Sequence, residues 1–141
     1  MRKTNSVFLI LLLTACGMIR KPLTLLEACE KCDLSSAKRA LTQGGKVSDR
    51  DSNGLTPLMI ASRNCNAVEL VRALLAAGAR VDDKVPTKDF TPLMAAATNK
   101  TKGAPEIVAA LLSSRARVHD RTNTGLTPLI FASSTHGPSA N

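Results

Sequence analysis

The sequence predicts an all-α repeat solenoid, built from helix-turn-helix units that are joined by hairpin-like fingers. Three observations lead to this fold class. A six-residue motif recurs at residues 56–61, 91–96 and 127–132, at offsets of 35 and 36 residues. Each copy begins Thr-Pro-Leu, which is typical of a helix start. Apolar residues at helical spacing follow the first two copies, so stacked units could share one continuous core.

The first 15 residues are expected to be a signal peptide rather than part of the fold. Arg2 and Lys3 precede residues 7–15, an uncharged run of nine residues. This run is too short for a bilayer, which takes about 20 apolar residues. The segment ends Leu13-Thr14-Ala15-Cys16, which resembles the bacterial lipobox, where cleavage falls before a cysteine that then carries lipid. An ordinary secretory signal and a buried helix are the alternatives.

Cleavage there would leave 126 of the 141 residues and lower the formal charge from +8 to +6. Residues 16–22 would form a lipidated cysteine and a short tether, and several acyl chains on Cys16 would anchor the chain stably. In lipoproteins an Asp after the cysteine gives inner-membrane retention, and Gly17 stands there instead. The resemblance therefore implies the outer membrane, with the protein facing the periplasm.

Each repeat is expected to contain two helices. The motif Thr can cap the first helix with its hydroxyl, and the Pro after it fits the first helical position. Gly44 and Gly78 are expected to end the second helix of their units in a left-handed conformation. Apolar residues at helical spacing mark the second helix: Val68, Val71, Leu74 and Leu75 in one unit, and Ile107, Val108, Leu111 and Leu112 in the next.

This arrangement resembles the ankyrin repeat, whose unit is a helix, a turn, a second helix and an extended finger. The resemblance covers residues 23–141, as repeats at about 23–55, 56–90 and 91–126 and a partial repeat at 127–141. The family usually has His after Thr-Pro-Leu; here Met59, Met94 and Ile130 imply apolar packing instead. The last unit has room for one helix, which is either a cap with a frayed tail or an edge that binds a partner helix.

Two non-glycine residues stand where other units have glycine. Arg115 takes the place of Gly44 and Gly78, and Asp89 takes the place of a turn glycine. If the backbone is the same, the left-handed conformation of Arg115 costs about 1–2 kcal/mol.

No catalytic residue, metal ligand or cofactor is expected, and the chain is predicted not to be an enzyme. His119 and His136 are the two histidines, and neither has a metal-ligand companion at helical spacing. The sequence has no phosphate loop, nucleophile elbow or zinc spacing. With no Trp, no Tyr and three Phe, it also lacks the stacking platforms of many nucleic-acid binders.

The cysteines leave several interpretations open. Cys29-Glu30-Lys31-Cys32 has the spacing of a redox motif, but it closes a helix instead of opening one. Cys32 and Cys65 occupy the same position in adjacent units, so they could form a disulfide in an oxidising compartment. The rival pair is Cys29 with Cys65, and three reduced thiols are the third reading. Stacked helices lie about 8–10 Å apart, beyond the usual Cα reach of about 4.4–6.8 Å; an extra residue near Cys65 could close this gap.

Binding is expected to depend on charge and shape. Stacked fingers would align three basic residues, here called the basic column: Lys46, Arg80 and Arg117. The basic column is either a solvated ladder among acidic neighbours or a docking stripe for an acidic protein surface. Ankyrin arrays commonly bind through finger tips and the exposed side of the first helices. By position, the resemblance places such contacts at Glu27, Ile60, Arg63, Ala95 and Phe131, where Phe131 is either an anchor or part of the end packing.

The sequence as a whole predicts a non-catalytic, lipid-anchored protein of the bacterial cell envelope that binds an acidic protein partner and is monomeric when free. The specific hypothesis is an immunity protein that neutralises a toxin delivered into the periplasm. The alternatives are a chaperone or protector of an envelope enzyme, a basic structural lipoprotein at the lipid surface, and a redox protein that uses Cys29 or Cys32.

Overall fold

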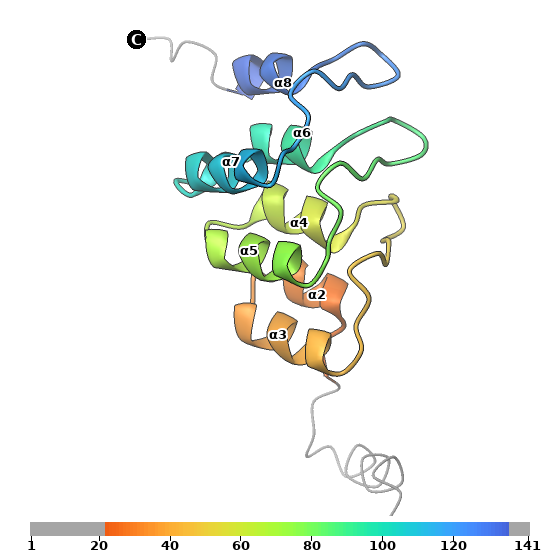
Figure 1. The fold of residues 1–141 in the computed structure, drawn as a ribbon, viewed down its shortest axis with the longest axis vertical. Coiled ribbons are helices and arrows are strands. Elements are labelled where there is room, and N and C mark those ends of the chain that lie inside the picture. Colours follow the sequence, from red (N-terminus) through yellow and green to blue (C-terminus); the bar gives the residue numbers. More distant parts are fainter. Residues whose placement is uncertain (1–21, 136–141) are drawn as a thin grey trace, which may run out of the picture.

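The computed structural model describes residues 22–135, which form an elongated stack of helix pairs (Figure 1). An inner layer contains α2 (Leu25–Glu30), α4 (Pro57–Asn64), α6 (Pro92–Ala97) and α8 (Pro128–Thr135). An outer layer contains α3 (Leu34–Thr42), α5 (Val68–Ala76) and α7 (Ala104–Ser113). Each inner helix contacts the next inner helix, and α2, α4 and α6 each pair with an outer helix. This arrangement confirms the predicted all-α repeat solenoid.

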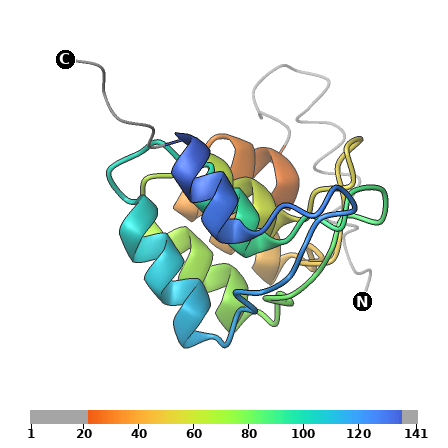
Figure 2. The same cartoon turned by 90° about the horizontal axis from the view of Figure 1, so that it is seen from above.

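Three loops project from one side of the stack as fingers: residues 43–56, 77–91 and 114–127 (Figures 1 and 2). We call them the first, second and third finger. Strand-type pairing in the described part of the chain is limited to one isolated bridge, between Val85 and Phe90 of the second finger. The fingers are therefore loops held by local turns and by contacts with each other, not a sheet.

The inner helices start where the motif predicts. The hydroxyl of Thr56 accepts a hydrogen bond from the backbone N–H of Met59, and Thr91 does the same for Met94. A proline occupies the first turn of both helices and costs no hydrogen bond there. Thr24 caps α2 in a reciprocal arrangement, because the Glu27 carboxylate accepts from its backbone N–H at 2.8 Å.

Left-handed residues end the outer helices, as predicted. Gly44 and Gly78 both have φ 91°, and Arg115 has φ 65° at the equivalent position. Asp89 has φ 52°, so it too adopts the conformation that glycine has in the other fingers. The two non-glycine positions therefore keep the repeat backbone at a conformational cost.

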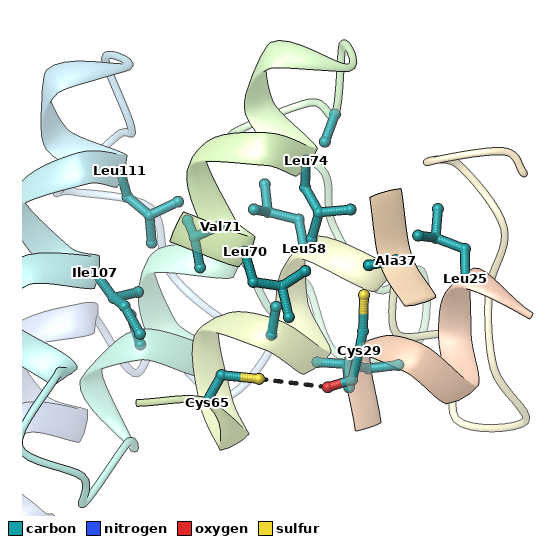
Figure 3. Close-up of a cluster of buried hydrophobic side chains, with 14 of the residues drawn as sticks. Leu25, Cys29, Ala37, Leu58, Cys65, Leu70, Val71, Leu74, Ile107 and Leu111 are labelled. Carbon is teal, nitrogen blue, oxygen red and sulfur yellow. Dashed lines mark hydrogen bonds between the residues drawn. The ribbon is translucent and has the colours of Figure 1, made fainter. Parts of the chain in front are cut away.

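The core consists of aliphatic side chains between the two helix layers (Figure 3). Met59 and Met94 are fully buried, so apolar packing does replace the family's usual His at these two positions. The same expectation is wrong for Ile130, which is 43% exposed. It lies on α8, and no described helix follows α8 to cover it.

A longer break between α6 and α7 ties the third unit to the second. The buried Asn99 side chain donates to the carbonyl oxygens of Ser62 and Cys65, both at 2.9 Å. Gly103 lies so close to Asn66 that an added Cβ would overlap the Asn66 backbone. The extra residues of this break thus form a polar joint between adjacent units.

Candidate functional site

A groove of about 900 Å³ lies between the fingers and the ends of the inner helices. The fingers contribute residues from all three loops, and the inner layer contributes Arg63 at the end of α4, Lys100 after α6, and α8. The lining residues are Asn53, Leu55, Arg63, Val85, Thr87, Lys88, Phe90, Thr98, Lys100, Thr122, Asn123, Thr124, Leu126, Phe131 and Thr135. Three of them are cations and none is a carboxylate, so the groove favours an anionic ligand.

The cations stand on both sides of the groove. Arg63 and Lys100 belong to the helix side, and Lys88 belongs to the second finger. All three are exposed, and none of them has an ion pair with another described residue. Their charges are therefore available to a ligand.

Two phenylalanines supply the apolar part of the groove. Phe90 and Phe131 meet edge to face, with ring centroids 5.5 Å apart and an interplanar angle of 88°. Such a pair contributes about 0.5–1.5 kcal/mol beyond its buried area. Both rings are half-buried, so each leaves part of its surface in the groove. Phe131 therefore packs the end of the stack and also lines the groove.

The fingers are linked to one another by polar contacts. Arg50 pairs with Asp83 at 2.9 Å between the first and second fingers. Asn123 of the third finger donates from its backbone N–H and its amide to carbonyl oxygens of Lys88 and Thr87, at 3.2 and 3.0 Å. These bonds hold the finger wall of the groove in place.

The basic column is exposed but not uniform. Lys46, Arg80 and Arg117 all reach solvent, yet none of them lines the groove. Arg117 forms an ion pair with Asp82 at 3.5 Å, and its backbone N–H donates to the same carboxylate at 2.9 Å. Its charge is thus partly neutralised, whereas Lys46 and Arg80 pair with no acidic group among residues 22–135.

The prediction that Ile60 and Ala95 contact a partner is wrong. Ile60 is 3% exposed and Ala95 is fully buried, so neither can touch a partner. The reason is that α4 and α6 are each packed between two inner helices and against an outer helix, which leaves no free side at these positions. Glu27 is exposed, but its carboxylate caps α2 and is not a free charge. Of the predicted helix positions, Arg63 and Phe131 line the groove.

The groove also contains residues that the sequence prediction missed. Lys100 lies in the extra residues between α6 and α7, outside the repeat alignment, so no periodic signal pointed to it. Phe90 lies in the second finger, directly before the Thr91 motif, and no other unit has an aromatic residue at this position to mark it in the alignment. The capping role of Glu27 did have a signal, because Thr-x-x-Glu at residues 24–27 is a capping-box pattern.

Of the cysteine pairings left open, the structure has the disulfide between Cys32 and Cys65, with Cα atoms 5.4 Å apart. Helix spacing suggested a wider gap. Both cysteines lie instead in the turns after the inner helices, and Cys32 has a left-handed backbone, φ 54°. Cys29 is a free, buried thiol whose pKa is raised to about 12, chiefly by burial and also by Glu30.

The Cys65 sulfur faces the backbone carbonyl oxygen of Cys29 at 3.4 Å (Figure 3). A disulfide sulfur carries no proton, so this approach is a packing contact. It places the free thiol's residue directly beside the disulfide, within the same buried cluster.

The family model described as ankyrin repeats (3 copies) matches residues 8–122. The chain belongs to the ankyrin-repeat family. No curated protein matches it. Ankyrin repeats are protein-binding modules, so the groove is a candidate protein-binding site on a generally non-catalytic scaffold.

Two further observations bear on the site. Within residues 22–135, no three His, Cys, Asp or Glu side chains are placed to share a metal ion. No helix in that part of the chain has the length and apolarity needed to cross a bilayer. The predicted signal peptide and Cys16 lie outside the described residues.

Proposed function

We propose that this ankyrin protein is a non-catalytic lipoprotein of the bacterial cell envelope that binds the acidic surface of a partner protein in its groove. One observation carries the binding role: among residues 22–135 the groove is lined by three cations without an ion pair, by no carboxylate and by a half-buried pair of phenylalanines. Charge complementarity would speed encounter and select against basic partners. Part of each ring would be buried in the contact.

Two observations support the envelope. A disulfide such as Cys32–Cys65 is typical of an oxidising compartment, since cytosolic thiols are kept reduced. The N-terminal sequence has the pattern of a lipoprotein signal ending at Cys16. A Cys16→Ser variant should lose both the acyl label and its fractionation with membranes. Unchanged membrane association without an acyl label would contradict the lipid anchor.

The binding site is tested by two charge-reversal variants, each with three changes of a basic residue to Glu. The groove variant carries Arg63→Glu, Lys88→Glu and Lys100→Glu, and the column variant carries Lys46→Glu, Arg80→Glu and Arg117→Glu. The partner is isolated from envelope extracts with the unaltered protein, and its affinity is then measured for each variant.

We expect the groove variant to bind at least about tenfold more weakly, mainly through a slower association rate, and the column variant to bind nearly as well as the unaltered protein. Loss of binding only in the column variant would place the site on the basic column. Equal affinity for all three proteins would contradict a charge-led site.

The most specific form of this function is neutralisation of a toxin delivered into the periplasm. What supports it is a small, preformed binding surface on a chain whose N-terminal sequence has the pattern of an envelope lipoprotein. Deletion of the gene should slow growth only when the toxin is present, and the groove variant should fail to rescue. A growth defect without any toxin would instead favour protection of an envelope enzyme.

A further inference from the structure

The exposed large apolar side chains of residues 22–135 gather at one end of the stack. They are Leu112, Val118, Leu126, Leu129 and Ile130, and Leu129 is 78% exposed. At the other end, the exposed face of α3 carries polar residues such as Ser35 and Lys38. We call Leu112, Leu129 and Ile130 the C-terminal flank. The array is thus capped at its first unit and apolar at its last.

The repeat shows what covers these positions elsewhere. Leu129 corresponds to Leu58 and Leu93, which are 1% and 4% exposed, because α5 and α7 pack beside α4 and α6. No outer helix pairs with α8 within the described residues, and Figure 2 shows no described helix over α7 at that end. The site left open therefore has the position and length of an outer helix, which is nine residues in α5 and ten in α7.

Among the described residues, the outer layer also lacks a covering helix at this end. Leu112 on α7 corresponds to Leu75 on α5, and Leu75 lies beside Ala110 and Ser113 of α7. No described outer helix follows α7, and Leu112 is 43% exposed. An occupant of the flank would thus contact α8 with one side and α7 with another, as an outer helix does.

We infer that the C-terminal flank binds an amphipathic, acidic helix of a partner protein, which takes the place of the outer helix in the fourth unit. Charge selects this occupant. From the start of α7 to the end of α8 (residues 104–135) the chain carries Arg115, Arg117 and Arg121 against Glu106 and Asp120. Arg117 is paired with Asp82 and Asp120 with Lys84. Arg115 and Arg121 have no ion pair with a described residue, so this end keeps a positive balance. An acidic helix complements this end, whereas a basic one would be repelled.

Two other occupants fit less well. A second copy would carry the same positive balance at this end, and its described outer helices are already packed against inner helices. Residues 136–141 contain no large apolar side chain that could cover the flank. The flank adjoins the groove through Phe131, but its binding does not depend on the groove and extends beyond the function proposed above.

The inference is tested in living cells by photo-crosslinking of the full chain. Benzoylphenylalanine replaces Leu129 in one variant and Lys38, at the opposite end, in a control. We expect the Leu129 variant to crosslink to another protein, at a segment with apolar residues at helical spacing and flanking Asp or Glu, and the Lys38 variant not to. A crosslink to a second copy, to the chain's own tail, to the same product from both positions, or to nothing would overturn the inference.

A second experiment tests the shape of the site without the partner. A copy of residues 67–77 with Arg72→Glu is appended to the full chain by a flexible linker, which gives it a high effective concentration. We expect the unfolding temperature to rise by about 4 °C or more. The same fusion with Leu129→Glu and Ile130→Glu should show no rise, and these two exposed changes alone should leave folding intact. An equal rise in both fusions, or none in either, would contradict a helix site on the flank.

Discussion

Reduction of the Cys32–Cys65 disulfide should destabilise this protein strongly. The bond joins residues 33 positions apart and so closes a long loop in the unfolded chain. Loop-closure entropy for that length corresponds to about 3.7 kcal/mol at 25 °C. A domain of ordinary stability has only about 5–15 kcal/mol in total, so the loss would be a large share of it. The unfolding temperature should fall by about 10–20 °C.

The measurement is urea unfolding with and without a phosphine reductant, followed by circular dichroism because the chain has no Trp or Tyr. The reduced Cys65 thiol can donate to the Cys29 carbonyl oxygen that it already faces, which offsets part of the loss. A Cys32→Ser, Cys65→Ser double variant is the control, and its unfolding should not respond to reductant.

Alkylation supplies an independent check. Since its pKa is raised to about 12, Cys29 has almost no thiolate near neutral pH and should stay unmodified in the folded protein. Cys32, which is only half-buried, should react once the disulfide is reduced. A change in unfolding free energy below about 1 kcal/mol on reduction would refute the loop-closure reasoning. Rapid alkylation of Cys29 in the oxidised protein would refute its burial.

Three further predictions follow from the backbone and the caps. Gly78→Ala should lower the unfolding free energy by about 1 kcal/mol, because its added Cβ meets nothing within 4 Å and the only cost is that of alanine in a left-handed backbone. Arg115→Gly should not lower the unfolding free energy. A urea midpoint that is lower for Arg115→Gly than for Gly78→Ala would contradict this. Asn99→Ala should cost about 1–3 kcal/mol in the same assay, since the buried Ser62 carbonyl loses the Asn99 amide donor and the Cys65 carbonyl keeps only the Thr101 hydroxyl, at 3.2 Å. The pKa of Asp33 is lowered from 3.8, first by the Ser36 hydroxyl and then by the Ser36 backbone N–H. The stabilisation by Asp33 should therefore be complete above pH 3.8 and be lost as the pH falls through the lowered pKa of the folded state. In urea titrations at acid pH, the difference in unfolding free energy between the unaltered protein and Asp33→Asn should disappear.

The parts of the fold that the sequence predicts are those that depend on local chemistry. Thr56 and Thr91 act as caps because a hydroxyl before Pro-Leu satisfies a backbone N–H wherever the helix lies. Arg115 and Asp89 keep a left-handed backbone because the repeat register fixes the turn around them. Such features follow from one unit and its neighbours in the alignment.

The parts that escape prediction depend on how units pack. Ile60 and Ala95 look like surface positions in one unit, and only the two flanking inner helices bury them. Lys100 enters the groove from residues inserted outside the repeat register. The disulfide, too, depended on the turn conformation of Cys32, which no helix-spacing argument supplies. Packing of one unit on the next, and departures from the repeat, thus set the limits of the prediction.

The disulfide and the open end lie at opposite ends of the stack, and this has a consequence for motion. In a linear array each unit is stabilised only by its neighbours, so local opening is easiest at an end without a covalent link. The first two units are cross-linked, whereas α8 has its main helix contact, among the described helices, with α6. Amide exchange should then be slowest around α4 and fastest in α8. Because Phe131 lies on α8 and lines the groove, a ligand that fills the groove would have to order this last helix. The conformational entropy lost by α8 would then weaken the observed affinity.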